Sequence, residues 1–123
     1  MPALQPAPGI VLLAARLAFW LLLLAVVILS LLPVPYLPQQ AFSLWDKAQH
    51  ALGFAVLALL GGLAYPGRLP RLGVSLLLLG AAIELAQDAT GWRTGDWLDL
   101  TADLVGVFVG LALARLALHV CRR

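Results

Sequence analysis

Ionisable and amide side chains form three closely spaced pairs in an otherwise apolar chain, and these pairs are the residues best suited to chemistry. The pairs are Lys47 with His50, Glu84 with Gln87, and Asp99 with Asp103. Residues three or four positions apart lie on one face of a helix. Carboxylates combined with an ammonium group and an imidazole can bind a polar head group or transfer protons. The pairs therefore predict a polar site, provided that the elements carrying them converge.

The elements that must position these pairs are unusually apolar. Hydrophobic residues make up 63% of the 123 positions and charged residues 11%. Soluble domains are about half apolar and a quarter charged, so this composition is typical of a chain in lipid. The single cysteine, Cys121, excludes an intramolecular disulfide and a cysteine metal cluster. At this length we expect one domain, covering residues 1–123.

Four apolar runs are long enough to cross a bilayer as helices. We predict helices at about 10–32, 46–65, 70–88 and 97–119, with turn signals such as Pro66-Gly67 between them. Because the runs are rich in Leu and Ala and do not alternate, lipid-embedded strands are disfavoured. The predicted fold is all-α, a four-helix transmembrane bundle. Short connections should make the second and third helices, and the third and fourth, antiparallel neighbours.

Basic residues predict the orientation of the four spans. The side with both termini and the second connection carries Arg16, Arg68, Arg71, Arg115, Arg122 and Arg123, and the other side carries Lys47 and Arg93. Lys and Arg accumulate on the cytoplasmic side, so we predict that both termini are cytoplasmic. The net charge of +2 then reflects topology, and we expect no nucleic-acid partner.

The acidic residues gather on the opposite side from most of the basic ones. The outer half of a predicted helix or an outer connection holds all of them, namely Asp46, Glu84, Asp88, Asp96, Asp99 and Asp103. This segregation predicts a polar site that faces outward. A solvated rim would explain Asp88 and Asp96 alone.

Glu84 is expected to lie at membrane depth. Only about 18 Å of continuously apolar helix, from Leu72 to Ile83, precedes it, so a full span carries Glu84 at or within the hydrocarbon. Charged groups there cost at least about 2.5–3.5 kcal/mol each, and they tend to face the protein interior and pair. We expect one network of Lys47, His50, Glu84, Gln87, Arg93, Asp99 and Asp103. Two interpretations stay open, a ligand site and a network that only ties helices together.

Gly106 and Gly110 continue the helix face that carries Asp99 and Asp103. A GxxxG spacing lets another helix approach closely. Packing inside the bundle is the favoured interpretation, and an oligomer interface is the alternative.

The motifs taken together resemble the VanZ-like family of bacterial membrane proteins over about residues 45–110. The series is Asp46-Lys47-x-x-His50, Glu84-x-x-Gln87, Arg93 with Asp99 six residues later, Asp103 four beyond that, then Gly106 and Gly110. In the family the position after the Asp99 motif is often asparagine, and this chain has Asp103 there. This departure adds a negative charge where the family often has a neutral amide.

The resemblance implies a multi-pass protein of the bacterial cytoplasmic membrane, related to one associated with low-level resistance to teicoplanin, a lipidated glycopeptide. It supplies no reaction. Carried over by position, the site residues that it implies are Asp46, Lys47, His50, Glu84, Gln87, Arg93, Asp99 and Asp103.

The leading functional hypothesis is that the outward polar pocket binds the head group of an amphiphile. Candidates are an envelope lipid, a lipid-linked cell-wall precursor and a lipoglycopeptide antibiotic. Lys47 and Arg93 would contact phosphate or carboxylate, while carboxylates such as Glu84 would accept hydrogen bonds from hydroxyl or ammonium groups.

This hypothesis has three alternatives. An intramembrane hydrolase or transferase acting on such a lipid would use Glu84 or Asp99 as general base and His50 as proton shuttle. A purely structural network is the second alternative, and a small transporter ranks last because the first helix has no acidic residue. We predict no cofactor and no metal, since Lys47 and Arg93 would compete with a bound cation.

Overall fold

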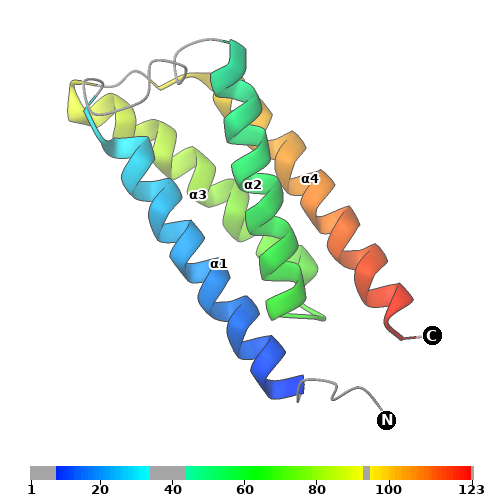
Figure 1. Ribbon diagram of the computed structural model, residues 1–123. Coiled ribbons are helices and arrows are strands. Elements are labelled where there is room, and N and C mark those ends of the chain that lie inside the picture. The colour runs from blue at the N-terminus through cyan, green and yellow to red at the C-terminus, as the bar shows by residue number, and fades with distance from the viewer. Residues whose placement is uncertain (1–7, 34–43, 93–94, 123) are drawn as a thin grey trace.

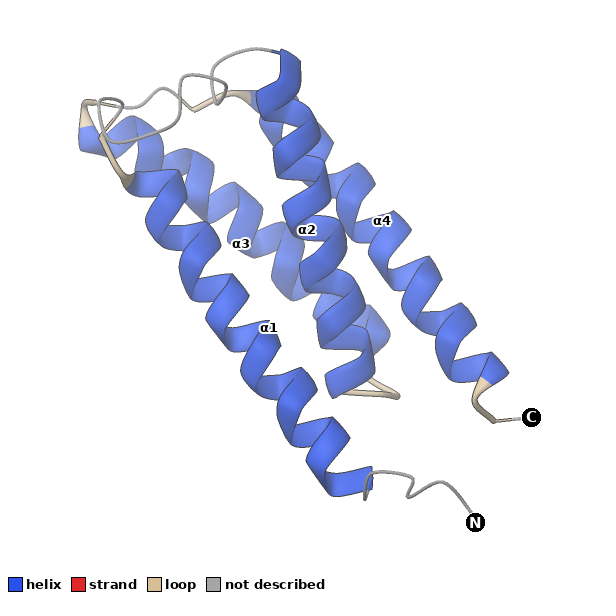
Figure 2. Ribbon diagram, viewed as in Figure 1, coloured by secondary structure: helices blue, strands red, loops and turns tan. Residues whose placement is uncertain are grey.

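The computed structural model describes residues 8–33, 44–92 and 95–122, and its elements are all helices (Figures 1 and 2). They are α1 (Pro8–Leu31), α2 (Leu44–Ala64), α3 (Leu69–Thr90) and α4 (Trp97–Val120). Each is long and apolar enough to cross a membrane, which confirms the prediction of an all-α protein with four candidate spans. The predicted and observed helix ends differ by two residues or fewer.

Glycine and proline set the helix ends around α3. Gly67 has a φ of 85° in the turn after α2, and Gly91 has a φ of 78° where it caps the end of α3. Both values lie in the left-handed region, which glycine enters without a Cβ clash. Pro70 occupies the first turn of α3, where its missing N–H would have had no helical partner.

The helix α4 begins with a side-chain cap. Asp96 precedes its first residue, and the Oδ1 atom of Asp96 accepts a hydrogen bond from the backbone N–H of Leu98 at 2.9 Å. An aspartate at this position satisfies one of the N–H groups that the first turn leaves without a partner. The cap therefore fixes where α4 starts.

The most extensive helix packing is between α2 and α4, which run in the same direction (Figure 1). Gly106 and Gly110 allow this approach. A Cβ atom at Gly106 would meet the backbone oxygen of Ala51, and one at Gly110 would meet that of Ala55. The GxxxG face of α4 thus lies against the backbone of α2 within one bundle.

The other helices pack less closely. The antiparallel neighbour α3 lies against α4, as the short connection led us to expect, but its contact with α2 is small. The helix α1 packs mainly on α2 and does not contact α4. The expected contact of α2 with α3 is present, and the glycines of α4 add the closer pairing of α2 with α4.

Large apolar side chains cover the outside as well as the core. The buried cluster at the centre comprises Phe19, Phe54, Leu57, Ala58, Leu76, Ile83 and Val107. Leu21 on α1, Leu78 on α3 and Phe108 on α4 are all more than half exposed. A 24-residue helix such as α4 is about 36 Å long, enough to cross a hydrocarbon core of about 30 Å. Lipid is the solvent that suits this surface.

The bundle has two chemically different ends. At the termini end, α1 begins and α4 ends (Figure 1). At the opposite end, which we call the polar end, α2 and α4 begin and α3 finishes. It carries Lys47, His50, Glu84, Gln87, Asp88, Asp96, Asp99 and Asp103.

Candidate functional site

A lysine bridges two helices at the polar end. The Nζ atom of Lys47 on α2 lies 2.8 Å from Oδ2 of Asp96 and 2.8 Å from Oδ1 of Asp99, both at the start of α4. The Asp99 side chain is largely buried, whereas Asp96 is partly open to solvent. An ammonium group has three N–H donors, and Lys47 donates two of them to these carboxylates. The bridge joins the first turns of the two parallel helices.

Asp96 connects three helices through separate groups. Its side chain accepts from Lys47 on α2 and caps α4, and its backbone N–H donates to Oε2 of Glu84 on α3 at 2.6 Å. The hydrogen bond from Lys47, followed by that from the Leu98 N–H, lowers the pKa of the Asp96 carboxyl below its usual value. Asp96 is therefore a charged structural centre of the site rather than a residue of a solvated rim.

A second carboxylate of α3 holds the segment that leads into α4. The Oδ1 atom of Asp88 accepts from the backbone N–H of Gly95 at 2.6 Å. A Cβ atom at position 95 would lie 2.7 Å from the backbone oxygen of Glu84, so a larger residue would displace this segment. Glycine thus lets the approach to α4 lie directly against α3.

Glu84 and Gln87 each have one buried side-chain oxygen that accepts no hydrogen bond from a described residue. The two residues are 6% and 1% exposed. Gln87 donates from Nε2 to the backbone oxygen of Ser30 on α1 at 2.8 Å. The Oε1 atoms of Glu84 and Gln87 have no hydrogen-bond partner within the described part of the chain. Most buried polar atoms in proteins have a partner, so these two require an explanation.

An imidazole and a carboxylate meet one turn deeper in the bundle. The Nδ1 atom of His50 on α2 lies 3.4 Å from Oδ1 of Asp103 on α4, and Asp103 is 1% exposed. Gly80 on α3 makes room for this carboxylate, because a Cβ atom there would lie 3.1 Å from Oδ2 of Asp103. The pair therefore belongs to the interface of three helices.

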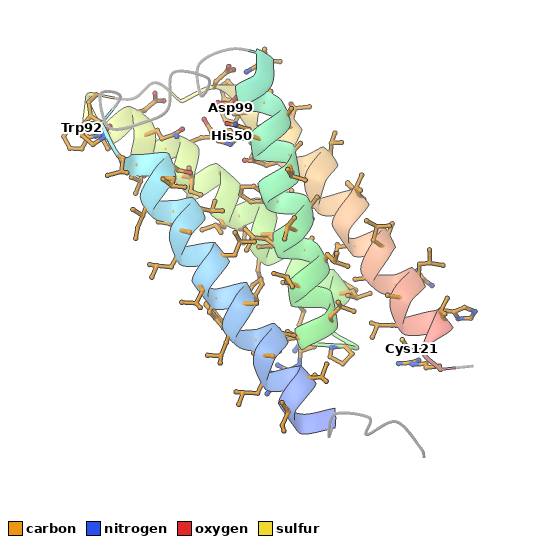
Figure 3. The ribbon with its side chains drawn as sticks, in the orientation of Figure 1. His50, Trp92, Asp99 and Cys121 are labelled. Carbon is orange, nitrogen blue, oxygen red and sulfur yellow. The ribbon has the colours of Figure 1, made fainter. Side chains whose placement is uncertain are left out.

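The structure brings most of the predicted site residues together. His50 and Asp99 point into the space between helices at the polar end, and Cys121 lies at the other end (Figure 3). The converging side chains are those of Lys47, His50, Glu84, Asp99 and Asp103, whereas Gln87 donates to the backbone of Ser30 on α1. Two predicted members fall outside what is described, namely the side chain of Asp46, whose backbone is in α2, and all of Arg93.

Sequence reasoning missed the residues that support the site. Asp96 has a sequence signal, since an aspartate immediately before a long apolar helix is a typical N-cap. Gly80 and Ser30 carry no such signal, because only the packing of three helices reveals what they contact. Gly95 marks a connection, but its contact with α3 depends on the fold.

The described part of the site is strongly acidic. Besides Lys47 and His50, its described residues include the carboxyl groups of Glu84, Asp88, Asp96, Asp99 and Asp103. An excess of carboxylates attracts hydrogen-bond donors and cationic groups. Among the residues that the structure describes, no group of three or more His, Cys, Asp and Glu side chains has an arrangement that would hold a metal ion.

No family model, no curated protein and no solved structure matches the chain. The resemblance of the motifs around Lys47, Glu84 and Asp99 to the VanZ-like family therefore rests on their order and spacing.

Proposed function

We propose that the polar end binds the head group of an amphiphilic envelope molecule that supplies hydrogen-bond donors. The observation that carries this proposal is the pair of donor-less Oε1 atoms on Glu84 and Gln87, both in buried side chains. A buried polar group without a partner costs about 1–3 kcal/mol, and a ligand donor would recover that cost. Hydroxyl and ammonium groups are suitable donors.

The position of the site favours an amphiphile over a water-soluble ligand. Trp97 and Leu98, beside the site at the start of α4, are 77% and 61% exposed, so apolar surface surrounds the polar groups. A molecule with an apolar tail can lie along these helices while its head group reaches the buried acceptors. Envelope lipids, lipid-linked cell-wall precursors and lipoglycopeptides all have this form.

The charge balance refines the class of head group. Lys47 already donates to Asp96 and Asp99, so binding of a phosphate by Lys47 would compete with two existing ion pairs. The carboxylate excess instead favours a head group that carries ammonium or several hydroxyl groups. An aminated or sugar-bearing head group is therefore favoured over a simple phosphate.

The family membership and the membrane orientation that we propose follow from the same residues. The chain would be a VanZ-like protein of a bacterial cytoplasmic membrane, with cytoplasmic termini and an outward-facing polar end. Supporting this orientation, Arg16, Arg68, Arg71 and Arg115 belong to the termini half of the bundle, and Lys47 belongs to the polar end.

Native mass spectrometry of the gently extracted protein tests the binding proposal. Glu84→Gln is the sharpest variant, because the new side chain keeps an oxygen for the Asp96 N–H but turns the donor-less acceptor into a donor. We expect a retained amphiphile in the unmodified protein and its loss in Glu84→Gln. Asp88→Asn is the matched control, since it removes one carboxylate from the same end of α3 outside the buried acceptors.

Two results would count against the proposal. The first is the absence of any bound amphiphile after extraction in several mild detergents. The second is an equal effect of Glu84→Gln and Asp88→Asn: equal loss would show that only the net charge of the polar end matters, and full retention in both would show that the Glu84 acceptor is not needed.

A hydrolase or transferase acting on the same molecule is a second candidate, favoured by the His50–Asp103 pair. A buried carboxylate beside an imidazole can orient the ring for proton transfer. Incubation of the protein with a bacterial lipid extract distinguishes catalysis from binding. A catalyst would generate products that His50→Gln does not generate, whereas a binding protein would leave the extract unchanged.

A further inference from the structure

The termini end has a groove of its own, away from the polar end. A groove of about 380 Å³ runs between α1 and α3. Apolar side chains such as Phe19, Leu72 and Leu76 line it, and so do Arg68 and Arg71. The groove therefore combines an apolar wall with two cations at the start of α3.

Aromatic contacts shape the wall formed by α1. The Nε1 atom of Trp20 donates to the hydroxyl oxygen of Tyr65 at 3.0 Å. The guanidinium of Arg16 lies 5.0 Å from the centre of the Tyr65 ring and donates from Nε to the backbone oxygen of Ala64 at 3.2 Å. These contacts fasten α1 to the end of α2 and hold the groove open on the side of α3.

The two arginines lack an anionic partner inside the described part of the protein. Arg68 and Arg71 are exposed, and their guanidinium groups make no hydrogen bond or ion pair with another described residue. The chain has no acidic residue before Asp46 or after Asp103, and none between Lys47 and Glu84. The described part of the chain therefore offers this pair no anionic side chain, and the pair is open to an anionic ligand.

The length of the groove matches one leaflet of a bilayer. Its lining on α3 extends from Arg71 to Leu79, a rise of eight positions or about 12 Å of helix. Half of a hydrocarbon core is about 15 Å. One acyl chain can therefore follow the groove from the head-group level to near the bilayer midplane.

We propose that this groove binds an anionic glycerophospholipid of the leaflet at the termini end. Its phosphate lies between Arg68 and Arg71, and one acyl chain lies along the apolar wall next to Trp20. Guanidinium groups suit phosphate oxygens because they offer a planar set of donors. Occupation of the groove does not depend on the polar end, so this inference stands or falls separately from the proposed function.

Quenching of Trp20 fluorescence tests the proposal directly. The protein is reconstituted into vesicles that contain phosphatidylglycerol or phosphatidylcholine with identical brominated acyl chains. Subtracting the signal of a Trp20→Phe variant isolates the contribution of Trp20 from those of the other tryptophans. We expect brominated phosphatidylglycerol to quench at several-fold lower mole fraction than brominated phosphatidylcholine. An arginine near the membrane surface contributes about a fivefold preference for anionic lipid.

Two kinds of variant keep the test decisive. Arg68→Gln with Arg71→Gln should bring the two lipids to equal quenching, whereas Arg115→Gln removes one charge from a separate groove on α4 and should leave the preference intact. Ser75→Phe fills the apolar wall and keeps both guanidinium groups, although it removes the hydrogen bond from the Ser75 hydroxyl to the Arg71 backbone oxygen; it should reduce quenching by both lipids. Equal quenching by the two lipids in the unmodified protein, or an equal loss in Arg115→Gln, would overturn the proposal.

Discussion

The ammonium group of Lys47 and the carboxylate of Asp99 lie 2.8 Å apart although 52 positions separate the residues in the chain. This contact joins α2 to α4 at the end where both begin. Because Asp99 is 7% exposed, water cannot replace the lysine fully if it is removed.

We expect Lys47→Ala to lower the melting temperature by several degrees and Lys47→Arg to lower it less, since arginine preserves the charge. The double variant Lys47→Ala with Asp99→Asn should be less destabilised than the sum of the two single variants. Thermal unfolding in detergent, measured by circular dichroism, gives the coupling free energy between Lys47 and Asp99. Strictly additive effects would show that the ion pair contributes no stability.

Gly106→Ala should destabilise the bundle by about 1–3 kcal/mol, because the added Cβ atom would meet the backbone oxygen of Ala51 and force α2 away from α4. Gly53→Ala is the matched control on α2. There the nearest heavy atom to a Cβ is Val26 Cγ2 at 3.9 Å, an ordinary contact. The control should be neutral or stabilising, because alanine favours the helix. Similar losses in the two variants would contradict the close approach of α2 and α4.

The four helices could be predicted because long apolar runs and Pro-Gly turns are local features of the sequence. The pairing of α2 with α4 could not be predicted. The spacing of Gly106 and Gly110 shows that some helix comes close, but nothing in the motif identifies α2 as that helix. The short connection predicted contact of α2 with α3, which is present, but the closest packing of α2 is with α4 at the glycines.

Within the candidate site, the burial of residues whose charge is costly to place in lipid could be predicted. Glu84 and Asp103 had to face the interior, and they do, with 6% and 1% exposure. Asp96 was harder to predict because its importance lies in one backbone and one side-chain contact that depend on the fold. Gly80 was not predictable, since its role is only to leave room for the Asp103 carboxylate.

The charge of Asp96 should stabilise the folded protein over a wide pH range. Its pKa is lowered below the usual 3.8, first by the hydrogen bond from Lys47. A lowered pKa in the folded state means that the stabilisation is complete above the unfolded pKa and is lost as the pH falls through the folded pKa. The melting temperature of the unmodified protein minus that of Asp96→Asn should therefore stay constant from neutral pH to about pH 4.5 and decrease below it.

Asparagine keeps the oxygen that caps α4, so the Asp96→Asn comparison isolates the charge. The same comparison in a Lys47→Gln background should lose most of its pH-dependent difference in melting temperature. The hydrogen bond from Lys47, the main cause of the lowered Asp96 pKa, is absent there. A difference that already declines as the pH falls through about pH 6 would contradict the lowered pKa.

The orientation of the bundle can be tested with its own cysteine. Cys121 is exposed immediately after α4, and no other cysteine occurs in the chain. If the arginine-rich termini end faces the cytoplasm, a membrane-impermeant maleimide should label Cys121 in inverted vesicles and not in intact spheroplasts. Trp92→Cys in a Cys121→Ser background provides the reciprocal control, because Trp92 is 53% exposed at the polar end. Labelling of Cys121 from outside would place the polar end in the cytoplasm, where the acceptors of Glu84 and Gln87 would face a different set of head groups.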